Sequence, residues 1–329
     1  MTEQKERLRI VCIGGGHGLS GMLRGLKRIT DDITAIVTVA DDGGGSGMLR
    51  EDLGILPPGD LRECILALAN TEPTMEKLLH YRFTEGSLAG QSFGNLFLAA
   101  MNGISESFDE AVHKMGDVLA ITGTVLPVTT SDVHLEAEFE TGERTIGESK
   151  IFYAKKINNS RIKQVRLIPQ NPPALPESLR AIARADIIVI GPGSLYTSII
   201  PNFLVDGIAE AVAAAHAKKI YVMNIMTQDG ETDGYTGFEH IQALLRHAPN
   251  CIDVCIANNE AISEDRLAPY REEGVTQIVI EREQIESLGI ELREYPLVAG
   301  SRYIRHSSTK LAEAIMEVYR GTGWQHSSR

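Results

Sequence analysis

The acids that follow the second apolar run of this chain are its clearest candidates for chemistry. Asp41 and Asp42 stand side by side in the sequence VADDGGGSG at residues 39–47. In nucleotide-binding α/β folds, an acid about 20 residues beyond the first glycine-rich loop accepts a hydrogen bond from a ribose hydroxyl, and carboxylates are also ligands of Mg²⁺. The alternative is a solvated turn, although a plain turn rarely needs two acids and four glycines. We therefore predict that both acids bind a ribose, a sugar or a metal ion, beside a flexible loop that contains Gly43, Gly44 and Ser46.

A glycine-rich segment near the N-terminus has the composition of a phosphate-binding turn. The apolar run Ile10–Ile13 ends in Gly14, Gly15, Gly16, His17 and Gly18, and apolar residues then recur at helical spacing. Glycine lets backbone N–H groups approach an anion closely, and the start of a helix favours negative charge. Leu19 occupies the place of the third glycine of G-x-G-x-x-G, and the G-K-[ST] ending of a P-loop is absent. We predict a phosphate contact here, with an ordinary strand-to-helix turn as the alternative.

Two later apolar runs end in similar polar segments. The run at residues 187–190 leads into GPGSLYTSIIPN, which repeats the pattern of the first turn with Gly191, Gly193 and Ser194. The run at residues 220–225 leads into a long segment with uncharged groups that suit a base or a sugar, namely Asn224, Thr227 and Gln228. Because the carboxyl ends of parallel strands meet at one edge of a sheet, we expect these segments to line the same crevice as residues 14–18.

Further polar positions border these segments. In PPGDLR at residues 57–62, Asp60 is placed either to cap a helix or to join Asp41 and Asp42 at a metal ion. We interpret Arg62 as a charge-assisted donor to a phosphate. Asn95 belongs to a helix start of small residues, which suits an anion but equally suits simple packing.

The elements that must position these residues follow an α/β pattern. Continuous β-branched runs such as residues 33–40 are typical of parallel strands buried on both faces, and helical patterns alternate with them. We predict a mostly parallel sheet in a nucleotide-binding core with an N-terminal part at residues 1–123 and a C-terminal part at residues 171–329. Residues 124–170 are predicted to be a small β-rich antiparallel insertion, with a short strand at 151–153, that is a cap or dimer contact rather than the chemical site. A strand at residues 277–280 and a helix at residues 309–319 are also expected.

The composition limits the classes of partner. A formal net charge of −12 argues against nucleic acid, which usually demands a basic face. No apolar run is long enough to span a bilayer and the N-terminus is polar, so we expect a cytoplasmic protein without membrane insertion. The four cysteines are too few for a disulfide framework and lack the spacing of a zinc site. A homodimer is the common default. Helix caps are expected at Ser307, Ser308 and Thr309, where an added phosphate would meet a helix N-terminus.

Together these segments resemble the gluconeogenesis-factor family, which is related to the 2-phospho-L-lactate transferases. The resemblance is carried by GGGHGL (14–19), VADDGGGSG (39–47), PPGDLR (57–62), FGN (93–95), GPGSLYTSIIPN (191–202) and NIMTQDGETDGY (224–235). It implies a Rossmann-like three-layer α/β/α fold in a cytoplasmic bacterial protein that binds a nucleotide-sugar such as UDP-glucose or UDP-N-acetylglucosamine. It also implies a role in growth on gluconeogenic carbon, in cell shape and in wall-precursor balance, with protein partners in cell-wall metabolism and no established catalysis.

The resemblance also implies a role for each matching segment. Residues 14–18 would cradle a phosphate, and the two acids at 41–42 would meet the sugar or ribose. The segment at 193–194 would close over the diphosphate, and the polar groups at 224–228 would complete the pocket.

One departure from the transferase relatives keeps other functions open. Those relatives carry a Pro-Asp-Leu-Asp pattern, whereas this chain reads Pro-Gly-Asp-Leu-Arg, with Arg62 in place of the second acid. A second interpretation is therefore a transferase of a phosphate-linked group, with Mg²⁺ held by Asp41, Asp42 or Asp60. A third is an NAD-binding oxidoreductase, which the lack of a His–Asp or Tyr–Lys pair for hydride transfer disfavours.

Overall fold

A seven-stranded sheet runs through the centre of the structure, a computed structural model that describes residues 8–321. The strand order is β10-β9-β8-β7-β1-β2-β3, and every neighbouring pair is parallel. The strands are β1 (Ile10–Gly14), β2 (Ile33–Val37), β3 (Thr124–Pro127), β7 (Ile187–Ile190), β8 (Lys218–Val222), β9 (Val254–Asn258) and β10 (Glu291–Tyr295). The predicted α/β fold with a mostly parallel sheet is confirmed.

The two central strands are buried along their whole length. Residues of β1 and β7 are apolar on both faces, as a strand covered by helices on each side requires. From β1 the chain proceeds outward through β2 and β3, and it returns to β7 to build the other half of the sheet. β1 and β7 are neighbours, with Ile13 opposite Ile190. In open α/β sheets, ligands bind outside the carboxyl ends of the strands at such a reversal of strand order.

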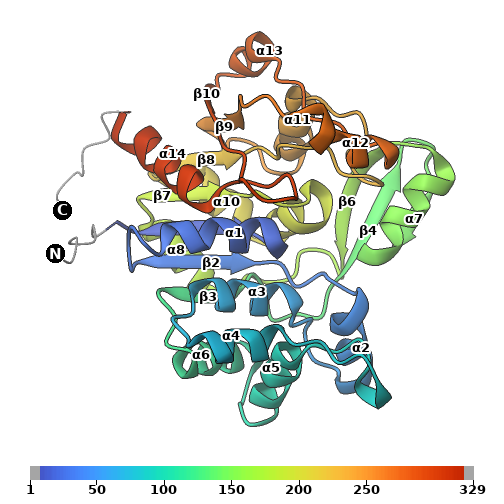
Figure 1. The fold of residues 1–329 in the computed structure, drawn as a ribbon, viewed down its shortest axis with the longest axis vertical. Coiled ribbons are helices and arrows are strands. Elements are labelled where there is room, and N and C mark those ends of the chain that lie inside the picture. The colour runs from blue at the N-terminus through green and yellow to red at the C-terminus, as the bar shows by residue number, and fades with distance from the viewer. Residues whose placement is uncertain (1–7, 322–329) are drawn as a thin grey trace.

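Helices cover both faces of the sheet. α1 (Gly16–Leu26) packs against α3 (Gly59–Leu68) and α14 (Ser308–Gly321), and Figure 1 shows these helices in front of the strands. α8 (Pro176–Arg184) and α10 (Ile208–Ala214) pack against each other behind them. Further helices are α2 (Gly44–Leu53), α4 (Pro73–His80), α5 (Phe93–Gly103), α6 (Phe108–Val118), α9 (Ile200–Phe203), α11 (Gly237–His247), α12 (Glu264–Glu272) and α13 (Arg282–Ser287). Within residues 8–321, no helix has the length and apolar character needed to cross a membrane.

The predicted start of the insertion at residue 124 is wrong, because residues 124–127 are β3 of the central sheet and pair with β2. The rest of the insertion forms its own antiparallel sheet in the order β5-β4-β6. It contains β4 (His134–Phe139), β5 (Arg144–Ile146) and β6 (Ile162–Ile168), shown in green at the right of Figure 1. The strand predicted at residues 151–153 is wrong, because these residues belong to helix α7 (Glu148–Asn158). Ile151 and Lys155 lie four residues apart on its buried face, and the acid at its start and lysines at its end suit the helix dipole.

The edge of the central sheet also differs from the prediction. Residues 277–280 form no strand, and Gln277 makes only an isolated bridge with Met226. The edge strand is β10, whose sequence ELREY buries only Leu292. A strand this polar fits an edge position, where much of its surface stays in water. The helix expected at residues 309–319 is confirmed as α14.

Candidate functional site

The turns that leave β1 and β7 meet at the centre of the sheet's carboxyl edge. The backbone N–H of Gly191 donates to the carbonyl of Ile13 at 2.9 Å. The side chain of Asn202, which is fully buried, donates from Nδ2 to the carbonyls of Gly14 at 3.1 Å and Ser198 at 2.8 Å. Asn202 therefore connects the first predicted phosphate turn to the second, a role that no local sequence pattern indicates.

Two positions of the first turn require glycine, one because the second turn approaches closely and the other because of its backbone conformation. A Cβ atom at Gly18 would lie 2.5 Å from the carbonyl oxygen of Pro192, which no real Cβ tolerates. Gly16 has a φ of +63°, a conformation that side chains rarely adopt. Residues 16–18 form the first turn of α1 rather than a free loop, so their backbone N–H groups stand at a helix N-terminus.

A cavity of about 450 Å³ opens on one side of the paired turns, and we call it the carboxyl-edge pocket. It contains seven of the residues that were predicted to contact the ligand, whereas residues 14–16, Gly191 and the acids at 41, 42 and 60 do not line it. Its lining includes His17, Gly18, Gly193, Ser194, Asn224, Thr227 and Gln228, together with Ile225, Met226, Ile304, Arg305 and His306. The expectation that the turns after β1, β7 and β8 line one crevice is confirmed.

Within this pocket, the predicted polar side chains chiefly shape the backbone. Asn224 accepts from the backbone N–H of Gly193 at 3.2 Å and donates to its carbonyl at 2.7 Å, which fixes the second turn. Thr227 accepts from the backbone N–H of Thr276 at 2.9 Å. Ser194 donates to the side-chain oxygen of Gln228 at 2.7 Å. Ser194 and Gln228 remain the more accessible pair for a base or sugar, since Thr227 is buried.

The two histidines of the pocket differ in environment. His17 is 69% exposed, and its Nε2 lies 3.9 Å from Oε1 of Glu63. His306 was not predicted, because nothing in its local sequence marks it. Burial lowers the pKa of His306 to about 4, so its ring is neutral near pH 7. It adds hydrogen-bonding capacity to the pocket without adding charge.

On the other side of the first turn lies a group of carboxylates, Asp41, Asp42, Asp60 and Glu148, which we call the acid cluster. Asp60 contacts the backbone of residues 15–16, and a Cβ atom at Gly15 would collide with it. Burial and the charges of Asp41 and Glu148 raise the pKa of Asp60 to about 7, against the opposing effect of the Gly16 N–H. Asp60 does not cap α3, because it lies inside the first turn of that helix. Asp41 is close by, since a Cβ atom at Gly59 would lie 3.1 Å from its carboxylate.

The loop predicted at residues 43–47 is instead the start of α2. Gly47 donates its N–H to the carbonyl of Gly43 at 3.0 Å, and a Cβ atom at Gly47 would collide with the carbonyl of Asp42. Glycines here permit tight packing of a helix start rather than flexibility. Asp41 accepts from the N–H of Gly43 at 2.8 Å and faces the buried hydroxyl of Ser46, and burial raises its pKa.

The insertion reaches the acid cluster, although it was expected to stand apart from the chemical site. The N–H of Ser149, in the first turn of α7, donates to Oδ1 of Asp42 at 2.8 Å. Burial raises the pKa of Glu148 to about 7, with further contributions from Asp41 and Asp42, while a hydrogen bond from Thr197 acts in the opposite direction. A role for the insertion as a cap or a dimer contact stays a prediction.

Metal binding by the acids also stays a prediction. Asp42 is engaged by α7, and across residues 8–321 no three His, Cys, Asp or Glu side chains converge as the ligands of a metal ion. The raised pKa values of Asp60 and Glu148 instead point to carboxyl groups that exchange protons near neutral pH.

Arg62 and Asn95 lie in the first turns of α3 and α5, and their predicted contacts with a ligand stay predictions. The guanidinium of Arg62 donates to Glu63 at 2.6 Å, so a neighbouring carboxylate balances its charge. Its stem lies against Gly94, where a Cβ atom would approach it to 2.6 Å. The N–H of Asn95 donates to Ser92, which caps α5, while its side-chain oxygen is buried and has no partner among the described residues.

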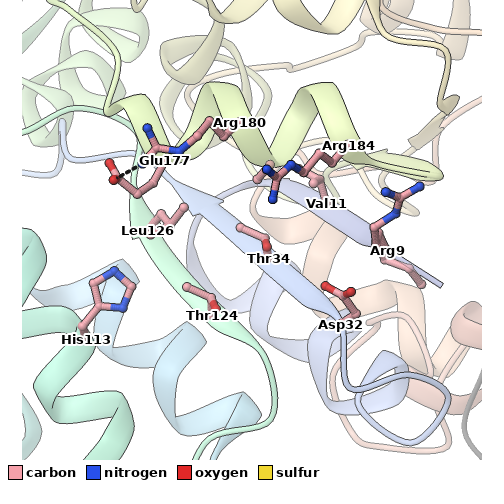
Figure 2. A pocket seen from close by; sticks show the side chains of 12 residues that line it. Arg9, Val11, Asp32, Thr34, His113, Thr124, Leu126, Glu177, Arg180 and Arg184 are labelled. Atoms are coloured by element: carbon pink, nitrogen blue, oxygen red, sulfur yellow. Dashed lines mark hydrogen bonds and ion pairs between the residues drawn. The ribbon is translucent and has the colours of Figure 1, made fainter. Parts of the chain in front are cut away.

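A second cavity, of about 310 Å³, lies at the amino ends of β1, β2 and β3 (Figure 2). Two of its arginines are paired with carboxylates. Arg9 makes a two-pronged contact with Asp186, at 3.0 Å from Nε and 2.7 Å from the terminal nitrogen, and Arg180 pairs with Glu177. None of the predicted site residues lines this cavity. The candidate site is therefore at the carboxyl edge.

Comparison with known proteins finds matches over most of the chain. The family model described as 2-phospho-L-lactate transferase CofD matches residues 10–298. A relative from Thermoanaerobacterium thermosulfurigenes is 55% identical over 309 residues, which cover 94% of this chain and 96% of that protein. The protein named gluconeogenesis factor from Bacillus subtilis is 44% identical over 317 residues, covering 95% and 98% of the two chains. A crystal structure of a Bacillus halodurans protein matches with a TM-score of 0.91 and 43% identity, covering 95% of this chain and all of that one.

Proposed function

Because this chain belongs to the gluconeogenesis-factor family, within the wider group that the 2-phospho-L-lactate transferase CofD model describes, we propose that it is a nucleotide-sugar-binding factor. The ligand that we propose is UDP-N-acetylglucosamine or UDP-glucose. With this ligand bound, the protein would signal the supply of wall precursors to its protein partners during growth on gluconeogenic carbon. This signal would in turn affect cell shape.

The observation that carries this proposal is that three neighbouring regions at the carboxyl edge suit three different parts of a nucleotide-sugar. The carboxyl-edge pocket offers both apolar and hydrogen-bonding groups, such as Met226 and Gln228, which suit a nucleoside. The paired turns at Gly18 and Gly193 follow, with a helix N-terminus that suits a diphosphate. The acid cluster lies on the other side of the first turn, where Asp60 would collide with a Cβ atom at Gly15, and carboxylates are suited to accept hydrogen bonds from sugar hydroxyls. A nucleoside, a diphosphate and a sugar in series match this arrangement.

Calorimetric titration tests the proposal directly. UDP-N-acetylglucosamine, UDP-glucose and NAD are titrated separately into the purified protein, with and without Mg²⁺. We expect saturable binding of a UDP-sugar that is recovered unchanged afterwards. Binding of NAD alone, or of neither class, would overturn the proposal.

A second candidate function, a transferase of a phosphate-linked group, is favoured by the acids with a pKa near 7. A carboxylate of that pKa in a crevice suits a general base that removes a proton from an attacking hydroxyl. Asp60 and Glu148 would take that role, and Mg²⁺ would offset the charge of the phosphates. Consumption of the UDP-sugar in the presence of Mg²⁺ and an acceptor alcohol, followed by phosphorus NMR, would favour this function over the binding factor.

A further inference from the structure

Helix α7 connects the two halves of the crevice. At its start, Ser149 donates to Asp42, and Gly147 has a φ of +113° with no room for a Cβ atom beside Asp42. Along its length, Lys155 pairs with Asp233 at 3.0 Å and Lys156 pairs with Asp229 at 2.6 Å. Both of these acids belong to the segment after β8 that also carries Gln228. The insertion is therefore fixed at both ends of α7, and its first residue, Glu148, is held at the crevice.

The surroundings of Glu148 lack a balancing cation. Its neighbours are the carboxylates of Asp41 and Asp42 and the hydroxyl of Thr197. Burial raises the pKa of Glu231 to about 7, and the nearby charge of Glu148 adds to that rise. Among the described residues, no lysine or arginine forms an ion pair with Glu148. A group that donates hydrogen bonds would satisfy this carboxylate.

Two buried amide side chains at the start of α2 give a second, independent observation. Gln91 and Asn95 are 6% and 3% exposed, and their side-chain oxygens have no partner among the described residues. A Cβ atom at Gly45 would lie 3.1 Å from the Gln91 oxygen and 3.6 Å from the Asn95 amide nitrogen, which places both amides at the first turn of α2. A Cβ atom at Gly43, two residues before Gly45, would lie 4.0 Å from the Glu148 carboxylate.

Buried polar groups without partners are costly, and native structures keep few of them unless a ligand or water satisfies them. At the start of α2, within the described part of the chain, the side-chain oxygens of Gln91 and Asn95 have no donor, and the carboxylate of Glu148 has no cation. A ligand that donates hydrogen bonds, as a ring with hydroxyl and amide groups does, would satisfy these acceptors.

We propose that Glu148 is a specificity-determining residue that reads the hydroxyl or amide donors of the sugar on a nucleoside diphosphate. This assignment rests on the proposed binding function and deepens it. The insertion thus supplies the carboxylate that selects the distal group, while the core supplies the nucleoside and diphosphate contacts.

The test compares two ligands on three proteins. UDP, which lacks the distal sugar, and UDP-N-acetylglucosamine are titrated into wild type, Glu148→Gln and Glu143→Gln. Glu143 is a matched control, because it is an exposed acid on the same insertion. We expect Glu148→Gln to weaken UDP-N-acetylglucosamine by roughly 10- to 100-fold, as loss of a hydrogen bond to a charged group predicts, and to leave UDP unchanged. The control should bind both ligands as wild type does.

Each other outcome has a defined meaning. Equal loss of both ligands in Glu148→Gln, or no loss of either, would overturn the assignment while leaving nucleotide-sugar binding intact. Wild-type binding of UDP and UDP-N-acetylglucosamine with the same affinity would also overturn it. Failure of wild type to bind either ligand would overturn the proposed function itself. If Glu148→Gln does not fold, Thr197→Val removes the hydroxyl that orients Glu148, and the same selective loss of UDP-N-acetylglucosamine is expected.

Discussion

Burial of the carboxyl groups in the acid cluster is unfavourable for the free energy of folding when these groups are ionised. Water stabilises an ionised carboxylate more than a protein interior does, so burial favours the protonated form. Asp60 and Glu148 each reach a pKa of about 7, from ordinary values of 3.8 and 4.5. Proteins retain such strained groups where they serve binding or catalysis. A ligand that donates hydrogen bonds to these acids would favour their ionised forms and recover part of the cost.

The first prediction concerns the stability of Asp60→Asn. Between pH 4 and pH 7 the folded protein keeps a proton on Asp60 that the unfolded chain has lost, so this residue lowers stability as pH rises to its folded pKa of about 7. The asparagine does not ionise, and we expect the variant to exceed wild type by about 1–3 kcal/mol at pH 8. The gain should be smaller at pH 5. Urea unfolding at both values measures it.

An exposed acid provides the control for that prediction. Asp52 lies on α2, exposed to solvent, and Asp52→Asn should not change stability differently at the two pH values. If Asp60→Asn gains equally at pH 5 and pH 8, the raised pKa is not the cause of its effect.

At the scale of elements, the sequence predicted where the central strands end better than it predicted which segments pack against the turns that follow them. Continuous apolar runs such as Ile187–Ile190 have few alternatives to a buried strand, and the glycines after them mark turns. Residues 151–153 fit a strand by composition, and only the packing of Ile151 and Lys155 decides for a helix. Likewise, no local pattern shows that Asp42 accepts from α7, since Ser149 lies more than a hundred residues away.

The second prediction concerns the docking of α7 on the segment after β8. A Cβ atom at Gly230 would collide with the ring of Phe152, and the residue has a φ of +71°. Gly230→Ala should therefore loosen α7 and speed backbone amide exchange over residues 148–158. Since Glu148 is the first residue of that helix, the variant should also lose part of the preference for UDP-N-acetylglucosamine over UDP.

A control variant at a neighbouring glycine distinguishes the effect of the collision with Phe152 from the effect of backbone strain. Gly234 has a similar φ of +69°, but a Cβ atom there would meet no other atom within 4 Å. Gly234→Ala should show comparable strain, with normal exchange in α7. Equal loosening of α7 in both variants would mean that the Phe152 contact does not hold the helix.

Across the whole molecule, the reversal of strand order between β1 and β7 assembles the site from distant parts of the chain. The first half of the core brings the acids Asp41 and Asp60, the second brings Asn224 and Gln228, and the insertion adds Glu148. Sequence patterns located most of these groups, because each follows a strand or opens a helix. They could not locate Asn202, His306 or Glu148, whose roles depend on contacts between segments far apart in the chain.

The third prediction follows from this assembly. A nucleotide-sugar that spans the crevice contacts both halves of the core and the start of α7, so its binding should slow amide exchange in all three places. We expect protection at residues 14–18, 191–194, 224–228 and 147–150 when UDP-N-acetylglucosamine is added at saturation, measured by mass spectrometry. The amino-end cavity serves as an internal reference, and residues 180–184 on α8 should exchange as before. Protection confined to one half of the sheet, or present at α8, would contradict a ligand that bridges the carboxyl edge.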